Sequence, residues 1–431
     1  MKNIKTKNNS GYVMLLTTII FMMVSTIIIF GLSTPILKQI LTTRDIWGAK
    51  QSYYLSEAGV EDVIYRLKDS AMSISVGATE TLSLNGYSTI TTSNSTVSGK
   101  TITSLSNQNG YKKNVETKLT QGSGVSFNYG ILTGDGGLYM TGESRIVGNI
   151  YSNGDIVGGS GVHITGTAIA ASGSKIFGNG GDYLYIGSNS SDMAWAKDIS
   201  NVSVTGSLYC LTGSDNDHHK ICNISKGVPD AIPMSVTVDN INQWKSEALS
   251  GGTYNGNFNV DWSGNIIGPR KITGGLTVKG GGTLMVTGTL WVVGNIDLTG
   301  GGKIKLSPSL GKNSSVIITD GYVDVGGGAS FDGSGTSGSY PIVVSTSICS
   351  ATNHCNNDNS AISLSGGAGS VVLVAPNGDI KINGGSGARS VMGHSISLSG
   401  GATITYEAGL ENPSFSSGPS GGWIISGWKE L

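Results

Sequence analysis

The sequence predicts a mostly β protein of the α+β class, in which a long N-terminal helix precedes a small antiparallel sheet and a parallel β-helix. Three observations predict this order. Residues 8–37 form an uncharged, largely apolar stretch near the start of the chain. Short runs of alternating apolar and polar residues follow. The remainder is rich in glycine, which supplies 67 of the 431 residues, and places pairs of alternating apolar residues between glycine-rich corners.

Composition and charge exclude several classes of protein. Charged residues make up 13% of the chain, against about 25% in ordinary soluble domains. The formal net charge of −1 provides no long-range field for a polyanion, so we expect no nucleic-acid partner. Only 9 prolines and no three-residue glycine period exclude collagen, and the regular apolar residues argue against disorder.

The N-terminal stretch predicts a membrane segment. A helix of about 20 apolar residues spans a bilayer, and residues 8–37 exceed that length. Lys2, Lys5 and Lys7 precede the stretch, which favours a cytoplasmic N-terminus and an extracytoplasmic C-terminal body at the cell surface. A cleaved secretory signal is disfavoured, because such signals have an apolar core of about 7–15 residues and a small-residue cut site.

The membrane stretch continues into an amphipathic segment, so we expect one helix over residues 12–69 after a basic leader, residues 1–11. Apolar residues recur near helical spacing after Pro35, with charged residues between them. The residues of this predicted apolar face are Ile36, Ile40, Tyr54, Ala58, Val63 and Leu67.

The uncharged stretch and "YYLSEAGVEDVIYRL", residues 53–67, resemble the N-terminal region of PilX-type minor pilins of type IV pili and of the related tip pseudopilins of type II secretion. The resemblance implies a prepilin peptidase cut between Gly11 and Tyr12. It also implies that the helix packs into a filament core, with other pilin-like subunits and the pilus assembly machinery as partners. The helix block that carries the resemblance is Ser56, Glu57, Ala58 and Gly59.

One position departs from the pattern of most major pilins. They carry Glu at the fifth residue after the cut, where this chain has Leu16. A glutamate in lipid is costly unless it is paired, and tip-type members of the family lack it. Leu16 therefore indicates either a tip or initiating subunit or a plain anchored protein.

The rest of the chain divides into a small antiparallel β region, residues 70–124, and a glycine-rich β-solenoid, residues 125–431, with a side insertion around residues 190–262. Short strands gain stability by stacking turn upon turn. The phrase V-G-N-I occurs at 147–150 and again at 293–296. Within the insertion we expect a short helix capped by Asp239, and two tryptophans, Trp423 and Trp428, are expected to cover the last turn.

The candidate chemistry is sparse. Cys210 with Cys222, and Cys349 with Cys355, are expected to form disulfides in an exported body. The first loop also holds acidic and histidine residues without the spacing of a metal site, so we expect no metal and no cofactor. These residues are Asp215, Asp217, His218 and His219.

The best carboxylate pair is Asp320 and Asp324, and no motif surrounds it. We therefore expect no catalytic residue. The predicted function is a non-enzymatic surface protein, a minor or tip subunit that displays its solenoid for adhesion, with a surface glycan or a host or partner cell as candidate partners. The alternatives are an anchored adhesin outside any filament and a glycan-active β-helix enzyme.

Overall fold

The computed structural model of the protein contains two compact units. One comprises Met1–Tyr65, Ile74–Thr120 and Ile425–Leu431, and the other Arg66–Ser73 and Gln121–Ile424. The structure describes residues 10–68, 79–84, 87–96, 99–121, 125–181, 183–214, 220–355, 358–369, 372–411, 413, 415 and 423–431. The predicted fold class is confirmed: a long helix, a small antiparallel sheet and a large domain of parallel strands are all present.

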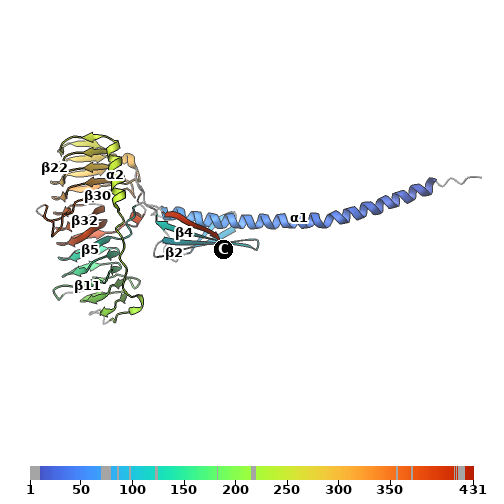
Figure 1. Ribbon diagram of the computed structural model, residues 1–431, viewed down its shortest axis with the longest axis horizontal. Helices are drawn as coiled ribbons and strands as arrows, with labels where there is room; N and C mark the ends of the chain where they lie inside the picture. Colours follow the sequence, from blue (N-terminus) through green and yellow to red (C-terminus); the bar gives the residue numbers. More distant parts are fainter. Residues whose placement is uncertain are drawn as a thin grey trace, which may run out of the picture. The chain divides into compact units, whose positions relative to one another are not determined.

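The first unit is built on helix α1, Ser10–Lys68, which is continuous through Pro35 (Figure 1). Four antiparallel strands follow it, in the order β1-β2-β3-β4. Their bounds are β1 Thr79–Leu84, β2 Tyr87–Thr96, β3 Gly99–Gln108 and β4 Tyr111–Gln121. Asn109 and Gly110, both with positive φ, form the two-residue turn that favours a tight hairpin between β3 and β4.

The last strand, β36 Trp423–Glu430, corrects the predicted end of the solenoid. It lies beside β4 and completes the small sheet. The N–H of Leu431 donates to Asn114 O at 2.9 Å, and Trp428 Nε1 donates to the Tyr53 hydroxyl of α1 at 3.3 Å. Strand β36 covers the edge of β4 that would otherwise be open. The sequence of the β-helix thus lies between two adjacent strands of the small sheet, β4 and β36.

The second unit is a parallel β-helix whose turns have three sides. The first side contains β7 Ile150–Ser152, β10 Ala168–Ala170, β13 Met193–Trp195, β16 Ser207–Tyr209, β18 Thr253–Tyr254, β21 Arg270–Ile272, β24 Leu290–Val292, β27 Ser315–Thr319 and β30 Pro341–Ser345. The second contains β8 Ile156–Gly158, β11 Lys175–Gly178, β14 Asp198–Ser200, β17 Thr212–Gly213, β19 Phe258–Asp261, β22 Leu276–Lys279, β25 Ile296–Leu298, β28 Val323–Val325 and β31 Ile362–Leu364.

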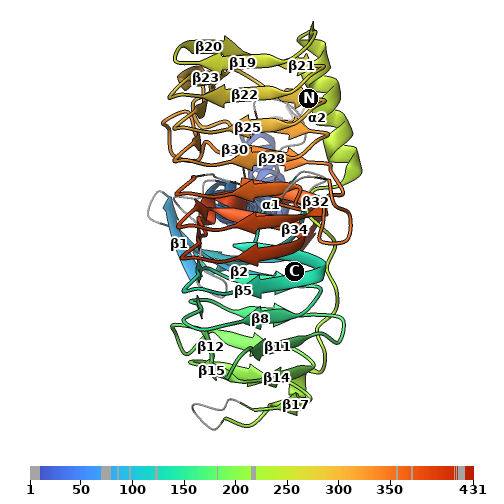
Figure 2. The same ribbon diagram turned by 90° about the vertical axis from the view of Figure 1, so that its left-hand side faces the viewer.

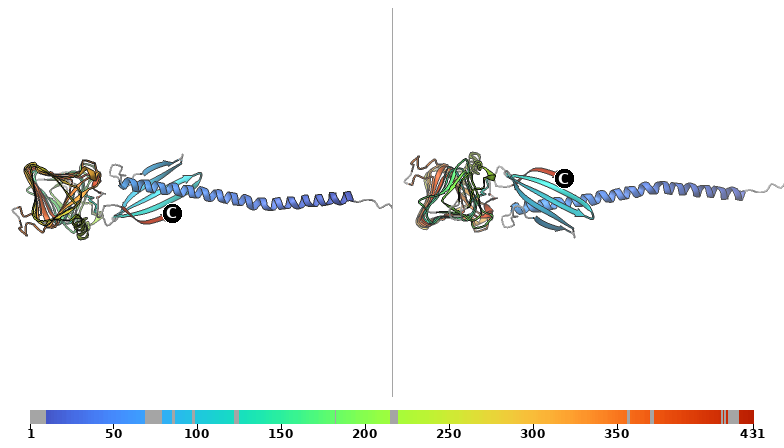
Figure 3. Two further views of the ribbon diagram at one scale, coloured as in Figure 1. Left: turned by 90° about the horizontal axis from the view of Figure 1, so that it is seen from above. Right: turned by 90° about the horizontal axis from the view of Figure 1, so that it is seen from below.

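Three longer strands bend across both of these sides: β5 Ile131–Met140, β32 Val372–Ile382 and β34 Ser390–Leu398. The third side contains β6 Arg145–Val147, β9 His163–Ile164, β12 Leu184–Ile186, β15 Val202–Val204, β20 Gly264–Ile267, β23 Thr283–Val286, β26 Lys303–Leu306, β29 Ser330–Asp332, β33 Gly387–Ala388 and β35 Thr403–Thr405. Seen along the stack, the turns lie over one another (Figure 3).

The order of turns in the stack differs from their order in the sequence. The chain begins the β-helix in its middle, at β5, and winds to one end at β17 (Figure 2). It then crosses to the other end, resumes at β18, and winds back until β34 pairs in parallel with β5. Ile396 is thereby paired with Leu138, and the segments by which the chain enters and leaves the stack are joined by Phe127 N and Leu410 O at 2.9 Å.

The excursion from the stack is shorter than the predicted insertion around residues 190–262. Strands β13 to β16 belong to the stack because each turns apolar side chains inward, among them Ala194 and Leu208. The excursion contains two short helices, η2 Ile224–Lys226 and α2 Val238–Ser250. The cap of α2 is Thr237 rather than Asp239, and the Thr237 hydroxyl accepts a hydrogen bond from Asn240 N at 3.3 Å.

The turns differ in length. Leu276 is paired with Ile296, Ile296 with Val323, and Val323 with Ile362, so these successive turns take 20, 27 and 39 residues. The inward residues are nevertheless completely buried at each level. Extra residues leave the stack at the corners, which is why the sequence shows no regular repeat.

The asparagine of the repeated phrase V-G-N-I accepts the same kind of hydrogen bond at two different corners. Asn149 Oδ1 accepts the N–H of Thr167 at 3.0 Å, and Asn295 Oδ1 accepts the N–H of Tyr322 at 3.1 Å, each in the next turn. The first copy leads from the third side to the first, and the second copy leads from the first side to the second. The phrase therefore encodes a corner rather than a fixed place in a turn.

A ladder of paired left-handed residues forms the corner before the third side. The first members, with φ between 58° and 63°, are Gly280, Gly300, Gly327, Gly366, Gly384, Gly400 and Gly142. The second members are Gly281, Gly301, Gly328, Gly367, Gly385, Gly401 and Glu143. The glycines among the second members donate their N–H groups to first members of the neighbouring turn, as from Gly385 to Gly400 O at 2.8 Å.

The two positions of this ladder are expected to tolerate side chains differently. A Cβ at Gly384 would lie 3.0 Å from Gly366 N, whereas a Cβ at Gly385 meets nothing within 4 Å. Asparagine accepts the left-handed conformation, so Gly384→Asn should lower the free energy of unfolding by about 1–3 kcal/mol through the clash. Gly385→Asn should change it by about 0.5 kcal/mol or less, as the natural Glu143 suggests. Denaturant unfolding followed by circular dichroism measures both, and equal midpoints would contradict this account.

Candidate membrane and assembly helix

The N-terminal part of α1 presents apolar side chains on all faces. Among the described residues, α1 provides the one helix that is long and apolar enough to cross a membrane, and none of its most apolar stretch is buried within the protein. Several of its hydroxyl side chains donate to carbonyl groups of the helix itself: Thr18 donates to Met14 O at 3.1 Å, and Ser33 to Ile29 O at 2.6 Å. Such internal bonds suit a helix in lipid, where water cannot serve as a partner.

The residues of the implied processing site lie at the start of this helix. Gly11 follows Ser10 in the first turn of α1. Tyr12 is 78% exposed and Leu16 is 52% exposed. Both therefore belong to the uncovered apolar surface, and the described part of the unit places no residue against them.

The C-terminal part of α1 packs on the small sheet through small residues. Gly48, Ser52, Ser56 and Gly59 follow one another at intervals of four, four and three residues, which places them on one face. Ser52 Oγ donates to Tyr111 O at 2.7 Å. A Cβ at Gly48 would lie 2.5 Å from the Tyr111 ring, so the helix approaches the strands as closely as its backbone allows.

The predicted apolar face is partly wrong. Tyr54 is exposed, because the helix turns its serine and glycine face toward the sheet. Ile36 and Ile40 are exposed, and they precede Gly48, the first residue of that face. Of the other predicted positions, Val63 is buried and Ala58 is half-buried, and the side chain of Leu67 lies outside those that the structure describes. The other large apolar residues that pack in this contact are Leu55 and Val60.

The block Ser56–Gly59 has a structural role in this contact. Ser56 Oγ donates to Ser104 O of β3 at 2.7 Å. A Cβ at Gly59 would lie 2.6 Å from Ser104 Oγ and from side-chain atoms of Thr89 and Thr91. Glu57 and Ala58 are half-buried. The spacing S-x-x-G is thus the part of the block that joins helix and sheet, and it fixes the apolar segment rigidly to the folded unit.

Both predicted cysteine pairs are joined in the structure. Cys210 and Cys222 have Cα atoms 5.1 Å apart, and Cys349 and Cys355 have Cα atoms 5.5 Å apart. Cys210 is buried in the core of the last turn and Cys222 packs against it. The first disulfide therefore closes that end of the stack. The residues between 215 and 219, including the acidic and histidine residues of this loop, lie outside the described residues.

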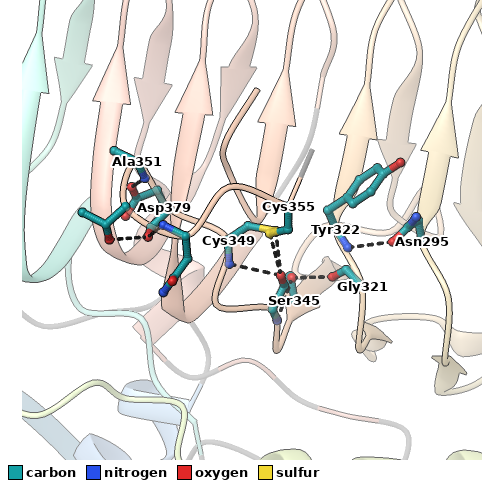
Figure 4. The surroundings of a disulfide bond; sticks show 12 residues. Asn295, Gly321, Tyr322, Ser345, Cys349, Ala351, Cys355 and Asp379 are labelled. Carbon is teal, nitrogen blue, oxygen red and sulfur yellow. Dashed lines mark hydrogen bonds between the residues drawn. A yellow bond between two sulfur atoms is a disulfide. The ribbon is translucent and has the colours of Figure 1, made fainter. Parts of the chain in front are cut away.

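The second disulfide holds a loop at a corner of the stack (Figure 4). Cys349 is buried in the core, whereas Cys355 is exposed. Ala351 N donates to Asp379 Oδ2 at 2.9 Å, and Ser345 Oγ donates to Gly321 O at 2.7 Å. These bonds tie the loop to neighbouring turns.

The two candidate carboxylates have different neighbours. Asp320 accepts hydrogen bonds from Trp291 Nε1 at 2.9 Å and Thr346 Oγ1 at 3.1 Å, and it is paired with Lys245 of α2. Asp324 instead lies beside Asp297 of the neighbouring turn. Burial raises the pKa of both Asp324 and Asp297. Within the ranges that the structure covers, no three His, Cys, Asp or Glu side chains are grouped to hold a metal ion.

Comparisons with known proteins add little. No protein-family model and no curated protein matches the chain. Among solved structures, the competence-associated pilin ComZ from Thermus thermophilus aligns over 89% of this chain and 97% of its own, with 10% identity and a TM-score of 0.29. So loose a superposition carries no argument about the function of this chain.

Proposed function

We propose that this protein is a non-enzymatic, pilin-like membrane protein that serves as a minor or tip subunit of a type IV pilus-like filament and displays its β-helix at the cell surface. The observation that carries the proposal is the division of α1 into two parts. One part is uncharged, largely apolar and uncovered, and the other is fixed to a small antiparallel sheet by close packing. This division suits a subunit that is anchored in the membrane before its helix enters a filament.

Three further features support the proposal. The leader ends in Gly11 directly before Tyr12, and both lie at the start of a helix that would survive a cut there. Leu16 offers no carboxylate to a neighbouring subunit, which favours a position with nothing above it. The β-helix is inserted between β4 and β36, so the pilin-like unit keeps its complete sheet.

A tip subunit predicts a specific distribution. Immunogold labelling of the β-helix on isolated filaments should mark one end of each filament, and the number of labels should not rise with filament length. An antibody against the major subunit serves as the control and should label along the whole length. Label that stays with the cell envelope and is absent from filaments would favour the permanently anchored adhesin instead.

The proposal of a non-enzymatic role follows from the partners of the candidate carboxylates. Asp320 is engaged by three side chains of the β-helix and α2, which fits a structural role. Loss of a polysaccharide-cleaving activity on Asp320→Asn and Asp324→Asn would instead support the glycan-active enzyme.

A further inference from the structure

A cavity opens on the third side of the β-helix, where the sheet of that side is interrupted. Strand β29 ends one sheet and β33 begins the next, and among the residues that the structure describes Gly369 bridges them, pairing with Ser330 and Gly387. The cavity has a volume of about 470 Å³. Pockets for small ligands typically measure about 300–1,000 Å³, so this one is large enough for a ligand.

The wall formed by residues 333–340 is held by hydrogen bonds to the body. Ser339 Oγ donates to Asn313 O at 2.9 Å and accepts the N–H of Ser334 at 3.2 Å. Tyr340 N donates to Ser314 Oγ at 3.0 Å. The cavity is therefore preformed, which lowers the entropic cost of binding a ligand.

The side chains of the cavity offer donors and acceptors close together. Arg389 Nη1 and Glu407 Oε1 lie 2.9 Å apart, and both side chains are partly exposed. Tyr340 is nearly buried beside them. Burial, with the nearby charge of Glu407, raises the pKa of Tyr340 to about 12, so the phenol is neutral at physiological pH. Asp332 adds a second carboxylate to the lining.

This arrangement matches the chemistry of a sugar ring. Neighbouring sugar hydroxyls donate to carboxylates and accept from a guanidinium, whose planar fork can make two hydrogen bonds at once. The lining carries one arginine against two carboxylates. A further negative charge on the ligand would be repelled, so acidic sugars are disfavoured.

We propose that this cavity is a binding site for a neutral saccharide. This binding site rests on the proposed display function and adds to it the class of ligand that the displayed β-helix would bind. Arg389 and Glu407 bind ring hydroxyls, and residues 333–340 form the fixed wall. Gly369 leaves the floor open, since a Cβ there would meet only Ser330 Cβ, at 3.7 Å.

The test is saturation-transfer NMR on the purified full-length protein, in a zwitterionic detergent without a sugar headgroup. Maltotriose and chitotriose are the neutral probes, and trigalacturonate is the acidic one. We expect transfer to at least one neutral probe and none to the acidic probe. Arg389→Ala should weaken binding about tenfold or more, because it removes charge-assisted hydrogen bonds. Gly369→Leu should abolish binding by filling the cavity.

Lys175→Ala is the matched control, because Lys175 also forms an exposed ion pair of the β-helix, with Asp198 at 3.5 Å, but does not line the cavity. Its binding should equal that of the wild type. Circular dichroism confirms that each variant is folded. Absence of transfer to both neutral probes, preference for the acidic probe, or undiminished binding by folded Gly369→Leu would each overturn the inference. None of these results bears on filament-end labelling, so the two proposals fail separately.

Discussion

Replacing Trp244 with alanine is expected to lower the free energy of unfolding of the β-helix by about 3–5 kcal/mol. Among the side chains that the structure describes, Trp244 is the largest that is completely buried, and its ring centroid lies 5.6 Å from that of Phe415. It belongs to an apolar layer between α2 and the outer surface of the first side of the stack. Removing it leaves a cavity under the helix that connects the two ends of the β-helix.

Guanidinium unfolding followed by far-ultraviolet circular dichroism measures this loss. Trp262→Ala is the matched control, since Trp262 lies in the same unit and is 86% exposed. Its effect should stay within about 0.5 kcal/mol. Equal midpoints for the two variants would show that α2 does not stabilise the stack.

The second large effect is expected at the contact between α1 and the small sheet. Gly59→Val should destabilise this contact by roughly 3 kcal/mol, because the new side chain would enter space held by Ser104, Thr89 and Thr91. Those hydroxyls are bonded to one another, with 2.7 Å between Thr89 Oγ1 and Ser104 Oγ. They cannot all move without losing buried hydrogen bonds.

Hydrogen exchange of the amides in β2 and β3 reports this change, because the residues that face Gly59 belong to these strands. Ala58→Val is the control: it makes the same β-branched side chain one residue away, at a half-buried position. It should leave protection of the strands nearly unchanged. If both variants exchanged alike, the close approach at Gly59 would not be what holds helix and sheet together.

The sequence was informative where structure is local. Short pairs of apolar residues predict strands, and the glycines between them predict corners. Both are visible in the sequence because each is built from neighbouring residues, as at the corner that contains Gly384 and Gly385. The stacking order could not be predicted. Leu138 pairs with Ile396, which is far away in the sequence. The alternation of apolar and polar residues specifies which side chains of a strand face inward, but it does not specify which turn is stacked on which.

Two missed features did leave signals in the sequence. The strands β27 and β30 are buried throughout, and their sequences "SVIIT" and "PIVVS" have consecutive apolar residues at the centre instead of an alternation, as is typical of strands covered on both faces. This signal could have located the side that α2 and its neighbours cover. Likewise, Gly48, Ser52, Ser56 and Gly59 mark a helix face that packs closely, which a search for large apolar residues overlooks.

The saccharide cavity had no comparable signal. Tyr340, Arg389 and Glu407 are separated in sequence and belong to different turns. Their proximity depends on the interruption of the third side at Gly369. The site is formed by the order in which the turns are stacked. It therefore could not be predicted from the composition or the motifs of the chain.

The most direct test of the pilin-like assignment is the N-terminus of the mature protein. Mass spectrometry of the native protein, from cells with an active prepilin peptidase, should find Tyr12 as the first residue. Gly11→Val should abolish that cut and retain the leader, since the proposed junction, which the resemblance to prepilins implies, has glycine directly before the cut. Recovery of the wild-type protein with the leader from Met1 intact would contradict the account.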